Sequence, residues 1–265
     1  DWVEQANEMD EVWVPSHFNK QTFEASGVKR PIHVIPLGIN TDYYHPGIRG
    51  YRTSPRYTFL SVFEWGERKA PEMLLRAFTR AFTDKDDVLL LLKVLNQDTS
   101  LSVKRHVDAL ELPKNSAPIA ILHNNIIKSY QMASLYRSAD CFVLPTRGEG
   151  WGMPILEAMA CGLPVIATNW SAQCDFMNEA NAYPLKIKGL IPAVAKCPYY
   201  KGFDWSDPDE EHLAHLMRHV YEHQDEAREI GKQAVADATA KWTWNHAAAK
   251  IIERLDQIPG GRVQS

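Results

Sequence analysis

The chain has 265 residues, of which 45% are hydrophobic and 23% are charged, and its formal net charge is −4. This composition is typical of a soluble globular chain that is long enough to bury a large core, and it excludes the disordered and collagen-like classes. The slight acidic excess provides no basic surface for wrapping nucleic acid, so nucleic acid is not an expected partner.

Membrane and redox signals are weak. The longest uninterrupted apolar run is 88–92, far short of the ~20 residues that span a bilayer. The four cysteines lie far apart without a Cys-x-x-Cys pair, and nothing at the start resembles a signal peptide. We therefore expect reduced thiols and a cytoplasmic protein, whose membrane contact, if any, is peripheral and on the inner face of the cell membrane.

Short β-rich runs alternate with helical patterns from about residue 10. Strands are expected at 12–14, 33–35, 59–62, 88–94, 119–122, 141–144 and 164–168, and helices from 16 and at 72–82, 101–110 and 130–138. Strands that are apolar on both faces and separated by helices predict a parallel sheet covered on both sides. The expected fold is therefore a doubly wound α/β domain.

The pattern loosens after Ser171, through a stretch at 183–205 that contains Pro, Tyr and Lys, and then becomes helical over 207–255. We expect one domain over 1–265. Its parts are a linker-like entry at 1–10, an α/β core at 11–206 and helices at 207–258.

Four histidines recur at helical spacing in the last region: His212, His215, His219 and His223. Neutral imidazoles at this spacing could bind a divalent ion. Because leucines, a methionine and a valine occupy the opposite face, we interpret the histidines as the polar face of an amphipathic helix. No metal site is expected.

The most informative segment is DCFVLPTRGEGWGMPILEAMACGLPVIAT at 140–168, which reads as strand, glycine-rich loop, helix and strand. Pro154 stands where the first helical turn should begin, and Gly162 stands just past the expected end. Glycines in the loop let the backbone approach a ligand closely, and the first helical turn offers free N–H groups with partial positive charge. This arrangement predicts an anion site suited to a phosphate.

Two carboxylates flank that site. Glu149 lies in the loop and Glu157 lies about one turn into the helix. Carboxylates repel phosphate but accept hydrogen bonds from hydroxyls, so a ligand with both phosphate and vicinal hydroxyls, such as a nucleotide sugar, fits the pair. The spacing alone is also consistent with a purely structural role for Glu157, as a first-turn acidic residue that interacts favourably with the helix dipole. Met153 occupies a position where the dinucleotide fingerprint requires glycine, which disfavours a nicotinamide dehydrogenase.

The stretch EGWGMPILE at 149–157 resembles the E-x7-E signature of retaining GT-B glycosyltransferases of group 1, also called family 4. PLGINTD at 36–42, LYRSAD at 135–140 and WTW at 242–244 extend the resemblance over nearly the whole chain. The resemblance implies one Rossmann-like half of a GT-B fold. It also implies transfer of a hexosyl group from a nucleoside diphosphate sugar to a saccharide or lipid-linked acceptor, with no cofactor and no catalytic metal.

The resemblance also implies roles for residues. In the family, the first glutamate contacts hydroxyls of the donor sugar and the second holds the ribose, which would be Glu149 and Glu157. Trp151 is either a lid over the sugar or simple packing. Backbone N–H groups of the loop receive the sugar and diphosphate, and the implied donor-binding stretch is Gly150, Trp151, Gly152, Met153 and Pro154.

A second family loop, after the strand at 59–62, supplies an arginine and, five residues later, a lysine that neutralise the leaving diphosphate. Lys69 matches, but Glu64 stands at the arginine position, so Arg68 is the candidate for the second cation. An exposed charged turn is the alternative interpretation of 67–69. The family reads the base through backbone groups, which implicates His123 and Asn124 without specifying UDP, GDP or ADP.

Residues 1–16 resemble the family's linker and first strand entering the C-terminal domain. The N-terminal acceptor domain is therefore expected to be absent, and the chain alone is expected to bind donor but to transfer poorly. Two alternatives remain. One is a noncatalytic nucleotide-sugar binder in which Glu64 marks lost diphosphate binding, and the other is a GT-B nucleotide-sugar epimerase.

Overall fold

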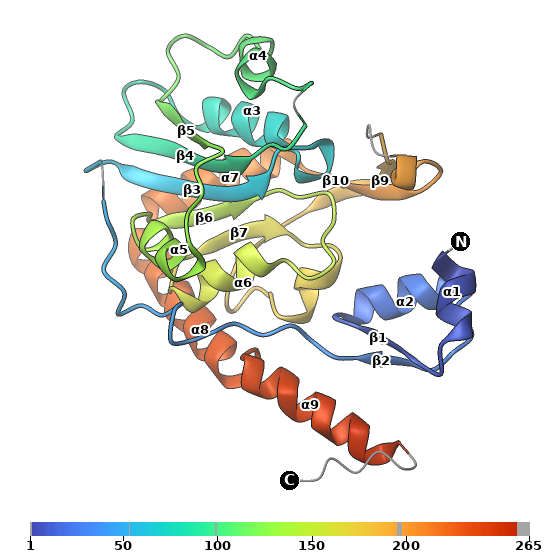
Figure 1. The fold of residues 1–265 in the computed structure, drawn as a ribbon. Helices are drawn as coiled ribbons and strands as arrows, with labels where there is room; N and C mark the ends of the chain where they lie inside the picture. The colour runs from blue at the N-terminus through green and yellow to red at the C-terminus, as the bar shows by residue number, and fades with distance from the viewer. Residues whose placement is uncertain (1, 53, 99, 195–197, 259–265) are drawn as a thin grey trace.

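The computed structural model describes residues 2–52, 54–98, 100–194 and 198–258 (Figure 1). The helices are α1 (Trp2–Glu8), α2 (His17–Ala25), α3 (Pro71–Ala81), α4 (Val103–Asp108), α5 (Ser129–Tyr136), α6 (Met153–Ala160), α7 (Glu210–Glu222), α8 (Gln224–Lys241) and α9 (Trp244–Gln257), with the 3-10 turns η1 (Glu67–Lys69), η2 (Ala172–Asp175) and η3 (Pro198–Tyr200). The strands are β1 (Val12–Val14), β2 (Ile32–Val34), β3 (Tyr57–Glu64), β4 (Val88–Leu95), β5 (Ile119–His123), β6 (Cys141–Leu144), β7 (Val165–Thr168), β8 (Tyr183–Leu185), β9 (Ile187–Pro192) and β10 (Asp204–Pro208).

Six strands form the central sheet, in the order β5-β4-β3-β6-β7-β8, and all their pairings are parallel. β3 is the first strand of the sheet in the sequence, and β4 and β5 follow on one side of it. The chain then crosses to the other side of β3, where β6, β7 and β8 follow in order. This is the strand order of the doubly wound Rossmann fold, and the direction of winding reverses between β3 and β6. The predicted fold class is confirmed.

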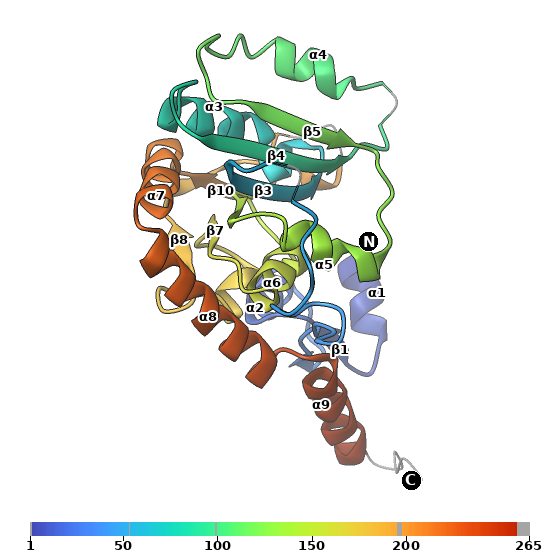
Figure 2. The same ribbon diagram turned by 90° about the vertical axis from the view of Figure 1, so that its left-hand side faces the viewer.

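Helices cover both faces of the sheet, as its apolar strands require (Figure 2). α3 and α7 pack against each other on one face, and α6 packs on β6 and β7 on the other, with α5 and α8 beside it. On the α3 face the ring centroids of Phe59 and Phe82 lie 5.5 Å apart, and those of Phe78 and Phe82 lie 5.4 Å apart. Burial of these three rings ties α3 to the strand that carries the first functional loop.

Contact between α6 and α8 depends on a glycine. A Cβ at Gly231 of α8 would lie 2.5 Å from the carbonyl oxygen of Gly162. In an exposed helix, Gly→Ala raises the free energy of unfolding by about 1 kcal/mol. Here the added Cβ would overlap with backbone atoms and force the helices apart. We expect Gly231→Ala to lower the free energy of unfolding by about 1–3 kcal/mol in urea titrations. Ala236→Gly, at an exposed position of α8, is the control for helix propensity; a stabilised Gly231→Ala would contradict the close contact.

The first two strands do not join the central sheet. β1 and β2 form a separate parallel pair, with Val12 opposite Ile32 and Val14 opposite Val34. Their buried residues, together with Val28, form a small cluster apart from the main core. The α/β core that we predicted over 11–206 thus contains a pair of strands that does not join the central sheet, because these three-residue strands bury their apolar side chains against α2 and each other. The six-stranded sheet begins at β3.

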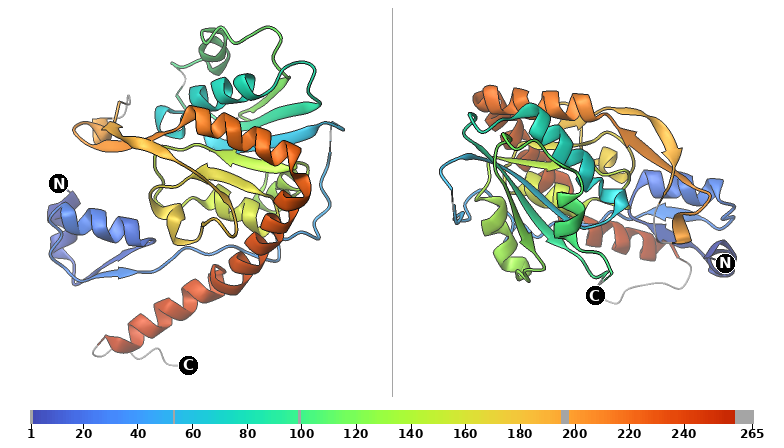
Figure 3. Two further views of the ribbon diagram at one scale, coloured as in Figure 1. Left: turned by 180° about the vertical axis from the view of Figure 1, so that it is seen from behind. Right: turned by 90° about the horizontal axis from the view of Figure 1, so that it is seen from above.

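Several contacts attach this N-terminal unit, which lies to one side of the central sheet (Figures 1 and 3), to the rest of the chain. Arg254 of α9 donates to the Glu11 carboxylate at 3.0 Å. At the start of α2, the backbone N–H of His17 donates to Asp175 Oδ2 at 2.9 Å, and the ring of Phe18 packs edge-on against Trp170 at 4.9 Å. These contacts place the N-terminal end of α2 beside the segment that follows β7.

The region 183–205, expected to be irregular, contains regular structure. β8 adds a sixth strand, with Pro184 opposite Ala167, and the position suits proline because β8 is an edge strand. β9 and β10 form an antiparallel hairpin that projects from the sheet (Figure 1). Both features escaped prediction because β8 has only three residues and β9 contains Gly189 and Pro192. Cys197 lies outside the described residues.

A salt bridge between α7 and the turn before β4 gives a pH-dependent contribution to stability. Arg218 Nη1 donates to Asp86 Oδ1 at 2.8 Å, and this hydrogen bond lowers the pKa of Asp86 to about 2. Because the folded-state pKa lies below the ordinary value, the stabilisation is complete above about pH 5 and is lost as the pH falls toward 2. We expect Asp86→Asn to cost about 1 kcal/mol at pH 7, after allowance for solvent screening. Thermal unfolding should show the difference from wild type vanishing near pH 2; an undiminished difference there would contradict the assignment.

Candidate functional site

Two loops meet where the direction of winding reverses. One follows β3 and contains η1, and the other follows β6 and runs through Gly148 to Gly152. The backbone N–H of Arg147 donates to the carbonyl oxygen of Arg68 at 2.7 Å, and Arg68 Nη1 donates to the carbonyl oxygen of Gly148 at 2.5 Å. Because both loops leave the carboxyl ends of neighbouring parallel strands, they form one edge of a crevice suited to a ligand.

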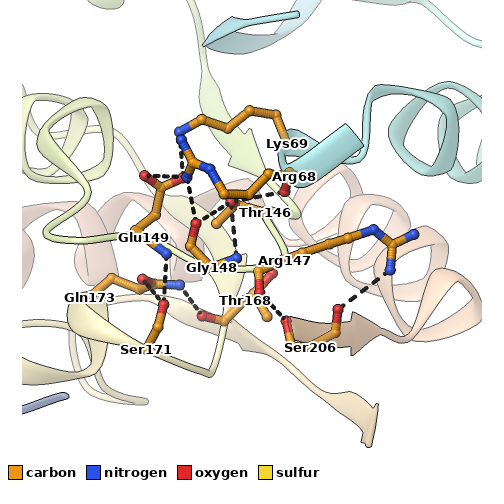
Figure 4. Close-up of polar contacts among 10 residues, drawn as sticks. All are labelled: Arg68, Lys69, Thr146, Arg147, Gly148, Glu149, Thr168, Ser171, Gln173 and Ser206. Carbon is orange, nitrogen blue, oxygen red and sulfur yellow. Dashed lines mark hydrogen bonds and ion pairs between the residues drawn. The ribbon is translucent and has the colours of Figure 1, made fainter. Parts of the chain in front are cut away.

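Three charged side chains from these loops form a cluster (Figure 4). Lys69 Nζ lies 2.5 Å from Glu149 Oε1, and Arg68 Nη1 lies 3.2 Å from Glu149 Oε2. The side chains of Glu149 and Lys69 are only 8% and 11% exposed. Burial opposes ionisation of Glu149, but the charges of Lys69 and then Arg68 outweigh it and lower the pKa of the carboxyl. Burial lowers the pKa of Lys69, and the charge of Glu149 opposes this shift. With all three groups ionised, the cluster carries one net positive charge.

A set of buried hydrogen bonds fixes the loop that carries Glu149 (Figure 4). The backbone N–H of Glu149 donates to Ser171 Oγ at 2.9 Å, Ser171 Oγ donates to Gln173 Oε1 at 3.0 Å, and Gln173 Nε2 donates to the carbonyl oxygen of Thr168 at 2.8 Å. Ser171 has a φ of +73°, a strained value for a residue with a side chain. The strand β7 and the segment after it therefore hold the backbone of Glu149 in place.

The helix that follows the loop begins and ends as predicted. Gly152 precedes α6 with a φ of +97°, Pro154 lies in the first turn, and Gly162 follows the helix with a φ of +80°. A side chain at 152 would be strained in this left-handed conformation. Pro154 has no N–H, and the N–H groups of Ile155 and Leu156 donate to the carbonyl oxygen of Gly152 at 2.9 and 3.2 Å. Among the described residues of the first turn, the N–H of Met153 is therefore the donor left available to an anion.

Trp151 is a core residue. It is 3% exposed, and its ring centroid lies 5.2 Å from that of Phe176 and 5.5 Å from that of Trp242. The interpretation of Trp151 as a lid over a sugar is therefore wrong, because its side chain packs between the loop and the chain before α9. Only its backbone can contribute to the crevice.

Glu157 lies in a different environment from Glu149. The hydroxyl of Tyr136 donates to Glu157 Oε2 at 2.6 Å, and the hydroxyl of Tyr44 also bonds to this carboxyl. Burial raises the pKa of Glu157, and the two hydroxyl bonds only partly oppose this effect. In the described part of the chain no cation pairs with it, which leaves an acceptor suited to hydroxyls. The two tyrosines had no sequence signal, since hydrophobic spacing does not show where a phenol hydroxyl is directed.

The other residues singled out from the sequence lie outside the cluster. Glu64, the last residue of β3, is exposed and makes no ion pair with Arg68 or Lys69 within the described ranges. His123 ends β5 and is exposed, two strands away from β3. The side chain of Asn124 accepts from the N–H of Asn96 at 2.7 Å and donates to its carbonyl oxygen at 3.1 Å, so it already joins the loops after β4 and β5.

The histidines of α7 have separate partners. His212 Nδ1 accepts from the backbone N–H of Lys186 at 3.1 Å, and His219 Nε2 lies 3.1 Å from Glu226 Oε1. Among the residues that the structure describes, no group of three potential ligands is placed to hold a metal ion. Over the same residues, no helix is both long and apolar enough to cross a bilayer.

Comparisons with known sequences give the family. The sequence model of the family described as "Glycosyl transferases group 1" matches residues 54–194. D-inositol 3-phosphate glycosyltransferase of Paenarthrobacter aurescens is 24% identical over 237 residues, which cover 87% of this chain and 52% of that protein. The probable sucrose-phosphate synthase of Thermosipho melanesiensis is 24% identical over 152 residues, 57% of this chain and 36% of that protein.

Comparisons with solved structures agree. Sucrose-phosphate synthase from Thermosynechococcus elongatus has a TM-score of 0.75 at 20% identity, over 98% of this chain and 61% of that one. Anabaena HepE, solved in complex with UDP-glucose, has a TM-score of 0.73 at 18% identity, over 97% of this chain and 66% of that one. The chain spans about half the length of the curated relatives that it matches over most of its own length. With its Rossmann-like sheet as one half of a GT-B fold, the chain belongs to the group 1 glycosyltransferases.

Proposed function

We propose that the chain binds the donor in a retaining glycosyltransferase that moves a hexosyl group from a nucleoside diphosphate sugar to a saccharide or lipid-linked acceptor. The observation that carries the proposal is the Arg68–Lys69–Glu149 cluster beside the N-terminal end of α6. The net positive charge of the ionised cluster and the N–H of Met153 suit a diphosphate, and the carboxylates of Glu149 and Glu157 can accept hydrogen bonds from hydroxyls.

The proposed roles follow from charge. Lys69 and Arg68 bind the diphosphate, Glu149 accepts from the donor sugar, and Glu157 accepts from the ribose. As the bond between the anomeric carbon and the diphosphate breaks, negative charge grows on the departing oxygen. Fixed cations in a partly buried site stabilise that charge in the transition state, so this mechanism requires neither a catalytic metal nor another cofactor.

The finer parts of the proposal concern the acceptor, the activity and the location. The relatives' names, an inositol phosphate glycosyltransferase and a sucrose-phosphate synthase, support a hydroxyl-bearing acceptor. Because the chain spans about half of the first of these relatives, we expect weak transfer when it acts alone. The three described cysteines are free, which supports a cytoplasmic location with at most peripheral membrane contact.

A second candidate is a noncatalytic binder of nucleotide sugars. The observation that favours it is Glu64, which stands where the family has an arginine and contributes no cation to the cluster. In that case Arg68 would not replace the missing family arginine, and the donor would bind without being turned over.

Prolonged incubation with UDP-glucose, GDP-mannose or ADP-glucose in EDTA, followed by proton NMR, tests the proposal. We expect slow release of one sugar, whose first-formed anomer has the configuration that it had in the donor, and loss of this release in Glu149→Ala. Glu179→Gln, which removes an exposed charge outside the cluster, is the control. A bound but intact donor would support the noncatalytic binder, and an isomerised donor would support an epimerase.

A further inference from the structure

Lys93 is a buried lysine near the carboxyl end of β4. The residue is only 6% exposed, and within the described part of the chain its ammonium makes no hydrogen bond and no ion pair. Burial lowers the pKa of Lys93, and among the described residues no carboxylate opposes that shift. A buried ammonium without a partner destabilises a fold, so a lysine kept in such a place is a candidate for binding an anion.

The strand register shows which face of the sheet carries Lys93. Its partner in the register is Val62 of β3. Two residues earlier in β3, Leu60 pairs with Phe142 of β6, whose ring centroid lies 5.8 Å from that of Tyr136 in α5. Paired residues of parallel strands share a face, as do alternate residues of one strand. Lys93 therefore lies on the face covered by α5 and α6, on the other side of the sheet from α3 (Figure 2).

This face is less covered than the other one at the carboxyl ends of the strands. The two register partners of Lys93, Val62 of β3 and Leu122 of β5, are only half-buried. On the α3 face, one residue further along, Phe63 is 5% exposed and Val94 is fully buried. Ligands of doubly wound sheets bind outside the carboxyl ends of the strands, so the partly uncovered face is the one that a ligand can approach.

Glu64 and Lys93 are diagonal neighbours on this face. Glu64 pairs with Leu95, which follows Lys93 by two residues, so both side chains belong to the same face of adjacent strands. Glu64 also acts on Lys69. Burial lowers the pKa of Lys69, and Glu64, after Glu149, is a carboxylate whose charge opposes that shift. Lys93 therefore shares a neighbourhood with Lys69 and with the position at which the family has an arginine.

Arg68 is less available than Lys93. Its Nη1 already donates to the carbonyl oxygen of Gly148 at 2.5 Å and lies 3.2 Å from Glu149 Oε2. The ammonium of Lys93 has no such partner within the described ranges. An anion between Lys69 and Lys93 would therefore gain a cation that is not already neutralised by a carboxylate.

Resting on the proposed function, we infer that Lys93 binds the donor diphosphate and supplies the cation that Glu64 cannot. The positive charge is moved from the end of β3 to the neighbouring strand, about 5 Å away at the usual strand spacing. Lys93 joins Lys69 and Arg68 in stabilising the negative charge that grows on the departing diphosphate. Glu64 then does not mark lost diphosphate binding, because its neighbour on β4 replaces the missing cation.

Lys93→Met tests the inference, because it removes the charge and keeps most of the side-chain volume. We expect the melting temperature of the unliganded chain to rise by a few degrees at pH 7, since a buried unpaired charge is lost. In calorimetric titrations with UDP, GDP and ADP in EDTA, the nucleotide that binds to the wild type should bind about tenfold more weakly. Lys114→Met, which removes an exposed ammonium in the turn before β5, is the matched control.

A double variant tests the position of the cation. Glu64→Arg in the Lys93→Met background returns the arginine of the family, and it should recover most of the lost nucleotide affinity. The inference is overturned if Lys93→Met binds the nucleotide as Lys114→Met does, if it lowers the melting temperature, or if Glu64→Arg recovers no affinity.

The same titrations separate this inference from the donor proposal. Weaker binding by Lys69→Met together with unchanged binding by Lys93→Met removes Lys93 alone and leaves the donor site in place. A wild-type chain that binds none of the three nucleotides removes the donor site as well.

Discussion

Replacing Lys69 by Met is expected to lower donor turnover by about 10²–10³-fold and to weaken UDP binding, because it removes one of the two cations that would face the diphosphate. The same change leaves Glu149 buried with only Arg68 beside it. Breaking one partner of a buried ion pair costs about 3–5 kcal/mol, so stability should fall as well. Urea denaturation measures the loss of stability, and calorimetric titration with UDP measures the loss of affinity.

A double variant separates these two effects. Lys69→Met with Glu149→Gln removes the buried charge along with its partner, so most of the lost stability should return. UDP affinity should remain low, because the cation is still absent. Recovery of both properties would mean that Lys69 serves only to neutralise Glu149, and wild-type UDP affinity in the single variant would remove Lys69 from the donor site.

Glu157→Gln is expected to make the unliganded protein more stable and to weaken UDP binding about tenfold. Burial raises the pKa of Glu157 above its ordinary value, so the ionised carboxylate destabilises the fold. That cost appears as the pH rises through the ordinary value toward the folded-state value, and it is complete above the latter. Glutamine keeps an acceptor for Tyr136 without the charge, which should raise the melting temperature by a few degrees at pH 7.

The pH dependence identifies the cause. The stabilisation by Glu157→Gln should disappear below about pH 4, where the wild-type carboxyl is protonated in both states. Tyr136→Phe is the comparison, because it keeps the charge and removes a hydroxyl that bonds to it. A Glu157→Gln variant that is less stable at pH 7, or that binds UDP as the wild type does, would show that the carboxylate is structural.

The two signature carboxylates thus differ in a way that suits different tasks. Two cations hold Glu149 ionised, whereas burial against two tyrosines favours the neutral form of Glu157. Shifts of opposite direction in the pKa values of two neighbouring buried carboxyls are typical of functional sites. The buried carboxylate of Glu157 lowers the free energy of unfolding, as expected if a binding residue is kept at a cost in stability.

Much of the fold follows from local patterns. Apolar strands such as Val88–Leu95 predicted a buried parallel sheet, and Pro154 and Gly162 predicted the ends of α6. The meeting of Lys69 with Glu149 was also predictable, because loops at the carboxyl ends of adjacent parallel strands lie along one edge.

Other features depend on tertiary contacts that leave no local trace. Trp151 lies among glycines, where an aromatic ring resembles a ligand contact, but Phe176 and Trp242 enclose it. The hairpin beside the site interrupts its own pattern with glycine and proline. β1 and β2 have the apolar composition of core strands, and only the packing of the chain shows that they form a separate pair.

Calorimetric titration of the chain with UDP, GDP and ADP in EDTA tests the proposed donor site most directly. We predict that one nucleotide binds tightly without metal and that Lys69→Met and Glu157→Gln each weaken this binding. Failure of all three nucleotides to bind, or binding that requires a divalent metal, would contradict a diphosphate site built from Lys69, Arg68 and the first turn of α6.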